Sequence, residues 1–260
     1  MGPVTTAIAL QCRDVTVEVP GRTLVRGLTF ELPAGRVLAV LGRNGAGKSS
    51  TLHAFAGLHA TAHGEVAVHG RTLAQWERRE FARALGLLPQ QVEDPFPATA
   101  LEAALVGRHP HLDFWAWEGA TDREAARAAL AAVDLAGCDG REVTTLSGGE
   151  RRRLSIATIL AQDPALFLLD EPIHQLDPQH QLEVLRLFRR LADAGRTVVV
   201  SLHDVGLAAR FADDALLLFG DGRWLHGDCG QVLNEQSLAE LYGVAMRELR
   251  WEGGRTFVAA

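Results

Sequence analysis

The chain has 260 residues, 47% of them hydrophobic, and a formal net charge of −6. This length suits one large domain, or a domain with an inserted subdomain, and the acidic balance argues against a nucleic-acid partner. Three scattered cysteines, Cys12, Cys138 and Cys229, indicate a reducing compartment without a disulfide framework. No segment has the roughly 18 apolar residues of a membrane span, so we expect a compact soluble protein that needs another chain for any work across a membrane.

The N-terminal segment alternates hydrophobic and polar residues at 15–19 and again at 28–32, with the turn Pro20-Gly21 between them. Alternation with period two is typical of strands that bury one face. We therefore expect an antiparallel sheet over residues 7–36.

Three continuous apolar runs, at 37–41, 166–169 and 198–202, are typical of strands buried on both faces of a parallel sheet. The first run leads into a glycine-rich loop, and the other two end at Asp170 and His203. Because ligands bind at the carboxyl ends of parallel strands, we expect these residues to share one crevice.

Between the first two runs, residues 91–146 are predicted to form a mostly helical subdomain. Thr121-Asp122-Arg123-Glu124 has the pattern of a capping box, and Ala126, Leu130 and Val133 then fall on one helix face.

Helix boundaries are also predicted in the second half of the chain. Asp163-Pro164 ends one helix, and Asp177-Pro178 begins another with the aspartate as N-cap. Strands at 215–219 and 224–226 and a helix near 237–242 complete the predicted tail.

The glycine-rich run Gly42-Arg43-Asn44-Gly45-Ala46-Gly47-Lys48-Ser49 contains the only lysine among 26 basic residues. Between a buried strand and a helix, the backbone N–H groups of such a loop surround phosphates, and a compact ammonium fits between phosphate oxygens where a planar guanidinium does not. The hydroxyl of Ser49 is placed to reach magnesium. The run predicts a nucleotide site.

Two further motifs, at residues 170–171 and 147–150, predict sites for a cation and for an anion. Asp170 and Glu171 follow an apolar run, which suits one carboxylate that holds magnesium, through water, and a second that polarises the attacking water. Ser147 and Glu150 can form a capping box, and the glycines between them expose the backbone, so this run predicts a second anion site.

Together, the runs GRNGAGKS, LSGGE and LFLLDE and the strand-terminal His203 resemble the Walker A, signature, Walker B and switch motifs of ABC-transporter ATP-binding subunits. The resemblance implies an α/β fold with a RecA-like P-loop NTPase core, an N-terminal antiparallel β subdomain and an inserted α-helical subdomain. It places one ABC domain over 1–260, with the core and β subdomain at 1–90 and 147–260 and the helical subdomain at 91–146.

The resemblance also implies an Mg-dependent ATPase with ATP and Mg²⁺ as cofactors. The expected catalytic residues are Glu171, His203, the lever glutamine Gln90 and Lys48, and the expected magnesium ligands are Ser49, Gln90 and Asp170. The residues expected to bind ATP are Gly42, Asn44, Gly45, Ala46, Gly47, Lys48, Ser49, Ser50, Ser147, Gly148, Gly149 and Asp177.

Two such subunits are implied to face each other head to tail, with Ser147 and Gly149 of one copy closing on the γ-phosphate that Lys48 of the other holds. The further partners would be integral membrane permease subunits and, through them, a substrate-binding protein outside the membrane. The subunit would then lie on the cytoplasmic face of the membrane.

Two positions depart from the family pattern. Val19 stands where the family usually has an aromatic residue that stacks on adenine, so we expect weaker stacking. His174-Gln175 replace the small residues that usually precede Leu-Asp in the D-loop, and we hypothesise that one of them contacts the opposing subunit.

The remaining histidines and a run of arginines are not assigned to a functional site. Pairs such as His59 with His63, or His109 with His111, lack a third and fourth metal ligand, and we interpret them as solvated or packed. Residues 151–153, three consecutive arginines, are predicted to be an exposed helix face.

Residues 99–111 are similar to the helical subdomain of importers for iron-siderophore, haem and cobalamin. Phe114, Trp115 and Trp117 are candidate contacts for a membrane subunit, with packing beneath the subdomain as the alternative. An importer ATPase is therefore expected, and an exporter subunit or a soluble non-transport ABC protein are the alternatives. A small-molecule kinase would leave LSGGE unexplained.

Overall fold

A computed structural model of the protein describes residues 7–91, 97–113, 116–252 and 254–260. Its strands are β1 (Ile8–Val19), β2 (Arg22–Pro33), β3 (Val37–Gly42), β4 (His63–Val68), β5 (Arg71–Thr72), β6 (Leu85–Leu88), β7 (Leu166–Leu169), β8 (Thr197–Ser201), β9 (Asp214–Leu218), β10 (Trp224–Asp228), β11 (Met246–Trp251) and β12 (Gly254–Ala259). Its α-helices are α1 (Lys48–Phe55), α2 (Arg78–Ala84), α3 (Ala100–Leu105), α4 (Ala120–Ala132), α5 (Gly148–Gln162), α6 (Pro178–Asp193), α7 (Val205–Phe211), α8 (Cys229–Val232) and α9 (Glu235–Tyr242).

The central sheet has six strands in the order β10-β9-β3-β8-β7-β6, parallel except for β10 at one edge. Both of its faces are buried. In β3, Val37, Ala39 and Leu41 pack into one hydrophobic core, whereas Leu38 and Val40 pack into the other. This two-sided burial explains why the strand has a continuous apolar sequence.

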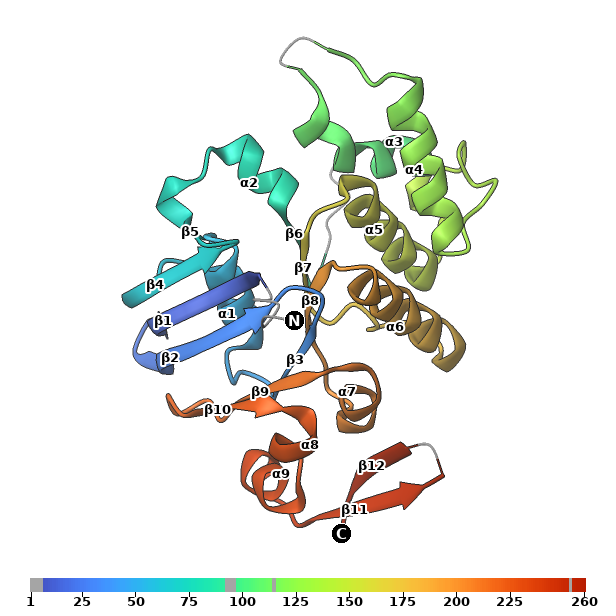
Figure 1. Ribbon diagram of the computed structural model, residues 1–260. Coiled ribbons are helices and arrows are strands. Elements are labelled where there is room, and N and C mark those ends of the chain that lie inside the picture. The colour runs from blue at the N-terminus through green and yellow to red at the C-terminus, as the bar shows by residue number, and fades with distance from the viewer. Residues whose placement is uncertain (1–6, 92–96, 114–115, 253) are drawn as a thin grey trace, which may run out of the picture.

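The two faces are covered by different elements. Figure 1 shows α5, α6 and α7 on one side of the central sheet and the four-stranded antiparallel sheet β2-β1-β4-β5, with α1, on the other. Helices α3 and α4 pack against α5. The expected antiparallel strands over 7–36 are confirmed as β1 and β2, and the α/β fold with its P-loop core is confirmed. The division at residues 91 and 146 stays a prediction.

One predicted helix start was wrong. Helix α4 begins at Ala120, and its N-cap is Gly119, whose N–H donates to Asp122 Oδ2 at 3.1 Å. Thr121 therefore lies inside the first turn. Asp122 thus takes the role predicted for Glu124, that of the acidic residue three positions after the N-cap, and Arg108 holds its carboxylate in place at 3.0 Å. The expected apolar face of Ala126, Leu130 and Val133 is buried.

The C-terminal hairpin of β11 and β12 was not predicted. Residues 246–251 read Met-Arg-Glu-Leu-Arg-Trp, with five good helix formers among them, so local propensity favours a helix. Pairing with β12 and packing of that strand against α7 override this preference. In the part of the chain that the structure describes, no helix combines the length and apolarity that crossing a bilayer requires.

Candidate active site

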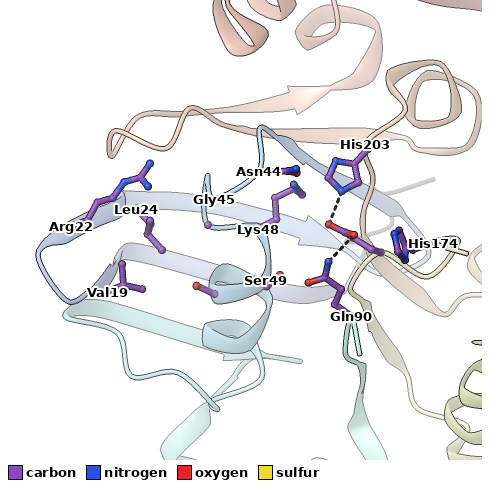
Figure 2. A pocket seen from close by; sticks show the side chains of 13 residues that line it. Val19, Arg22, Leu24, Asn44, Gly45, Lys48, Ser49, Gln90, His174 and His203 are labelled. Carbon is purple, nitrogen blue, oxygen red and sulfur yellow. Dashed lines mark hydrogen bonds and ion pairs between the residues drawn. The ribbon is translucent and has the colours of Figure 1, made fainter. Parts of the chain in front are cut away.

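Four neighbouring strands of the central sheet end at the same edge, and each is followed by a predicted site residue. The glycine loop follows β3, His203 follows β8, Asp170 and Glu171 follow β7, and Gln90 follows β6. Residues of the glycine loop, Gln90, Glu171 and His203 line an open cleft of about 680 Å³, and Asp170 lies next to it (Figure 2). The crevice expected at the carboxyl ends of the strands is therefore present.

The glycine loop adopts a backbone that only glycine accepts easily. Gly45 and Gly47 have φ values of 75° and 104°, and a Cβ at Gly47 would lie 2.9 Å from Cβ of Leu24. Gly47 is also the N-cap of α1, and it has no side chain to occupy the first N–H groups of that helix. These groups thus remain available for an anion at the positive end of the helix.

Lys48, the only lysine, lies at the start of α1 with a relative exposure of 5%. Its Nζ donates to the carbonyl oxygen of Gly42 at 3.0 Å. Burial lowers the pKa of Lys48, and the carboxylates of Glu171 and Asp170 act in the opposite direction. The ammonium is thus held by the backbone of the loop that is predicted to bind phosphate.

Asp170 and Glu171 are both buried, with relative exposures of 1% and 8%. The hydroxyl of Ser201 holds them together, since it donates to Asp170 Oδ1 at 2.7 Å and accepts the N–H of Glu171 at 2.8 Å. Sequence reasoning missed Ser201. The signal was present, because this serine is the one polar residue in the apolar run 198–202 and needs a partner once it is buried.

The side chain of Glu171 accepts hydrogen bonds from two directions. Nε2 of Gln90 lies 3.0 Å from Oε2, and Nε2 of His203 lies 2.6 Å from Oε1 (Figure 2). An ionised carboxylate only accepts, so this geometry assigns the proton of His203 to Nε2. Glu171 itself has a φ of 48°, a left-handed conformation that is costly for a residue with a Cβ.

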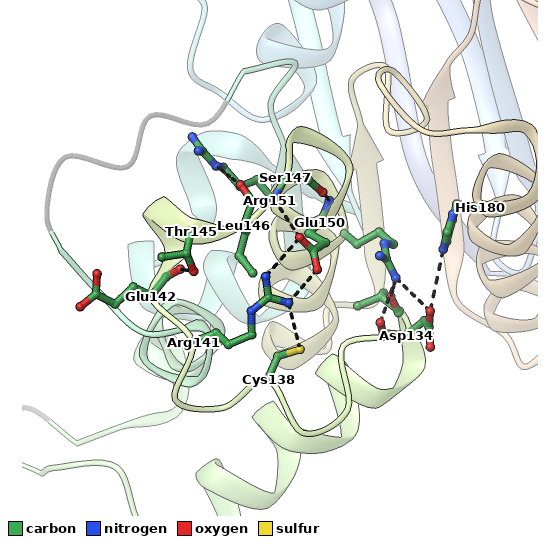
Figure 3. A network of polar contacts seen from close by, with 12 residues as sticks. Asp134, Cys138, Arg141, Glu142, Thr145, Leu146, Ser147, Glu150, Arg151 and His180 are labelled. Carbon is green, nitrogen blue, oxygen red and sulfur yellow. Dashed lines mark hydrogen bonds and ion pairs between the residues drawn. The ribbon is translucent and has the colours of Figure 1, made fainter.

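The second anion motif forms the predicted capping box at the start of α5. Ser147 Oγ accepts the N–H of Glu150 at 3.2 Å, and the Glu150 carboxylate accepts the N–H of Ser147 at 2.8 Å. Arg141 donates to the same carboxylate at 2.7 Å, and chiefly this bond lowers the pKa of Glu150 to about 2 (Figure 3). The carboxylate is therefore charged but paired, next to bare glycine backbone.

The cleft and the capping-box motif are not joined within one chain. Among the described residues, those that line the cleft include most of the glycine loop, Ser50, Gln90, Glu171 and His203. The predicted site residues that do not line it are Gly42, Ala46, Asp170, Ser147, Gly148, Gly149 and Asp177. Ser147, Gly148 and Asp177 are exposed at the starts of α5 and α6. Asp177 is the predicted N-cap, and it accepts the N–H of His180 at 3.0 Å.

The two unusual D-loop residues face different neighbours. His174 lines the cleft, whereas Oε1 of Gln175 lies 3.5 Å from where a Cβ of Gly148 would be. Contact of either residue with an opposing subunit stays a prediction. At the other end of the cleft, Val19 lies with Arg22 and Leu24 (Figure 2). The site therefore offers aliphatic surface at the position where the family usually has an aromatic ring.

The three consecutive arginines do not form one exposed face, so that prediction was wrong. Arg152 is buried, with a relative exposure of 7%, and donates to five main-chain carbonyl groups around Glu171. Arg153 donates to the carbonyl oxygens of Val133 and Asp134. Helical periodicity turns adjacent residues by about 100°, so three neighbours cannot share one face.

Of the candidate aromatic contacts, Trp117 is 89% exposed, and Phe114 and Trp115 lie outside the described residues.

The fold and this site define an ATP-binding P-loop ATPase whose glycine loop, acidic strand end and capping-box motif lie on one chain. Residues 25–174 match the family model described as ABC transporter, and the chain belongs to the ATP-binding subunits of that family. It binds ATP and is an ABC-type ATPase coupled to transport. The predicted family is thus confirmed.

Several known proteins are similar to this chain in sequence or in structure. The chain is 43% identical to the hemin import ATP-binding protein HmuV of Myxococcus xanthus, over 95% of this chain and 94% of that protein. A metal-chelate type ABC transporter, solved in an inward-facing conformation, superposes with a TM-score of 0.85 at 30% identity and covers 97% of this chain and 98% of its own. A dimeric ATP-binding cassette in a post-hydrolysis state with ADP and Pi superposes with a TM-score of 0.73 at 25% identity, over 85% of this chain and 98% of its own.

Proposed function

We propose that the chain is the ATP-hydrolysing subunit of an importer for haem or a related metal chelate. The observation that carries this proposal is the 43% identity to a hemin import ATP-binding protein over 95% of this chain. The likeness to a metal-chelate type transporter, at a TM-score of 0.85, supports the same substrate class. Siderophore and cobalamin import belong to this broader class.

Two copies of the chain are proposed to bind two ATP molecules between them, head to tail. Each cleft would be completed by Ser147 and Gly149 of the second copy. The exposed position of Ser147 and Gly148, away from the cleft of their own chain, supports this arrangement. The dimeric cassette with ADP and Pi is a relative in which two copies assemble.

The residues of the cleft suggest how hydrolysis is divided among them. Lys48 and the glycine loop would bind the phosphates, and His203 and Gln90 would hold Glu171 so that its carboxylate accepts a proton from the attacking water. Most of the rate would come from this positioning and from charge stabilisation.

Magnesium is a proposed cofactor, and the available donors fit it. Ser49, Asp170 and Gln90 offer a hydroxyl, a carboxylate and an amide oxygen, and Mg²⁺ in phosphate-binding sites prefers oxygen ligands from few side chains together with the phosphates. When bound, the ion would neutralise charge that develops on the phosphate oxygens.

The proposed partners at the membrane are permease subunits, which in turn would receive substrate from a binding protein, with this chain on the cytoplasmic face. Trp117 is compatible with a docking role, since its indole is 89% exposed and therefore does not pack beneath its own subdomain. It lies beside Leu112 and Glu118 in a shallow groove.

The test is transport by the assembled complex. We expect the chain to co-purify with the permease subunits encoded by its neighbouring genes, and vesicles containing that complex to take up haem when ATP is supplied on the side of this chain. The matched control is the same complex with Glu171→Gln. Uptake of a siderophore or cobalamin but not haem would change the substrate, and ATP-driven movement in the opposite direction would show an exporter and overturn the proposal.

A further inference from the structure

The residue that reaches most widely around Glu171 is not one of the motif residues. Arg152 lies in the second turn of α5, and its guanidinium has five N–H donors in a rigid planar arrangement. In this structure five bonds leave that group, and every acceptor is a main-chain carbonyl oxygen. The side chain therefore recognises backbone positions rather than other side chains.

These carbonyl groups belong to two separate segments that meet at the cleft. On the segment after β7, Arg152 donates to Asp170 O at 2.7 Å, Glu171 O at 2.8 Å and Pro172 O at 3.1 Å. On the segment after β6, it donates to Pro89 O at 2.8 Å and Gln90 O at 3.3 Å.

Both segments need such support. Glu171 has a φ of 48°, and a strained backbone of this kind persists only where its surroundings hold it. The N–H of Glu171 is held by Ser201, and its carbonyl group is held by Arg152. The backbone of Glu171 is thus fixed on both sides of its Cα, and its carboxylate points into the cleft.

The positive charge of Arg152 lies next to the carboxylates of Asp170 and Glu171. Burial lowers its pKa, and the carboxylates of Asp170 and Glu171 counter that effect, so this cation is balanced by the two anions next to it. A neutral substitute would leave several buried carbonyl groups without a donor.

We propose that Arg152 is a positioning residue for hydrolysis, which holds the backbone of Gln90 and Glu171 in register so that their side chains form the 3.0 Å hydrogen bond. It also joins both segments to α5, the helix that begins with the Ser147 capping box. This inference rests on the proposed role of Glu171 in hydrolysis.

The experiment compares Arg152→Lys and Arg152→Gln with Arg153→Gln in the full-length chain. Arg153 is a matched control because it lies on the same helix, is also largely buried and also donates to carbonyl groups, but those belong to Val133 and Asp134. We expect kcat for ATP hydrolysis to fall roughly 10- to 100-fold in the Arg152 variants, the cost of misplacing a reacting group. The dissociation constant for ATP should change less than about threefold, and the control should keep its kcat within about threefold.

A second comparison separates positioning from stability. In a Glu171→Gln background the carboxylate that Arg152 positions is already lost. Adding Arg152→Gln should therefore lower the residual rate by less than about threefold. Equal losses in both backgrounds would overturn the proposal, as would normal kcat in both Arg152 variants. Loss of ATP binding along with kcat, including failure to fold, would show a structural role and overturn it too. Near-normal hydrolysis by Glu171→Gln alone would instead identify a failure of the proposed role of Glu171.

Discussion

At the scale of single residues, four largely buried charged side chains lie at the cleft. Lys48 and Arg152 supply two positive charges, and Asp170 and Glu171 supply two negative ones. Isolated buried charges are costly, and the opposite charges next to each of these groups offset that cost. Each of them is also held by hydrogen bonds, which fix the charges before any ligand binds.

Lys48→Arg tests whether shape or charge matters at the only lysine. The guanidinium keeps the charge but cannot occupy the space of an ammonium beside Gly42 O, so we expect ATP affinity to fall roughly tenfold or more, the loss of at least one charge-assisted bond. A binding titration with ATP measures this. Lys48→Met is the matched control without charge, and an unchanged affinity for the arginine variant would contradict the assigned role.

At the scale of elements, the start of α5 combines two needs that conflict. A helix N-terminus with bare glycines attracts anions, yet the capping box puts the carboxylate of Glu150 in the same turn. Arg141, from the segment before α5, resolves the conflict because its guanidinium donates twice to that carboxylate, at 2.7 and 3.4 Å (Figure 3).

The pH dependence of stability tests this pair. The pKa of Glu150 is lowered to about 2, mainly by Arg141, so the stabilisation is fully present above the unfolded pKa near 4.3 and is lost as pH falls towards 2. We expect Arg141→Gln to lower the free energy of unfolding slightly at pH 7, because solvent screens an exposed pair, and we expect the difference from wild type to shrink below about pH 4.

Urea denaturation at a series of pH values between 7 and 3 measures that difference. Arg141→Lys keeps the positive charge and serves as the control, with a smaller loss. If the gap between wild type and Arg141→Gln were the same at pH 3 as at pH 7, Glu150 would not be the partner that matters.

At the scale of the whole molecule, the cleft of one chain contains the groups that we propose bind and hydrolyse ATP, while the capping-box motif of the same chain is exposed elsewhere. A charged triphosphate in a cleft open to solvent would react in water, where electrostatic stabilisation is weak. A second copy that covers the cleft would exclude water and bring the N–H groups of its α5 to the phosphate.

Glu171→Gln tests this assembly. The amide cannot take a proton from water, so we expect hydrolysis to slow by roughly two to three orders of magnitude, the contribution of one positioned catalytic group. ATP binding should persist, so ATP with Mg²⁺ should trap a dimer that X-ray scattering and sedimentation detect. Lys48→Met, which binds ATP weakly, should stay monomeric in the same assay. A nucleotide-bound monomer of Glu171→Gln with a closed cleft would contradict the two-copy arrangement.

Much of the architecture was predictable because local sequence carried it. Continuous apolar runs marked the strands buried on both faces, and alternation marked β1 and β2. The glycine loop, the acidic strand end and the capping box at Ser147 were recognisable because each depends on residues adjacent in the chain. Where local rules failed, at the start of α4 and in the C-terminal hairpin, a distant partner decided the outcome.

By itself, therefore, the sequence determined the family and the candidate groups for the ATP site, since both follow from short-range patterns of residues along the chain. Only the tertiary structure decided what holds those groups in place. Ser201 binds Asp170 and Glu171 from a neighbouring strand, and Arg152 reaches carbonyl groups as far as 63 residues away in sequence. The physical reason is that a buried donor must find its acceptors wherever folding brings them, and no local pattern encodes such distant partners.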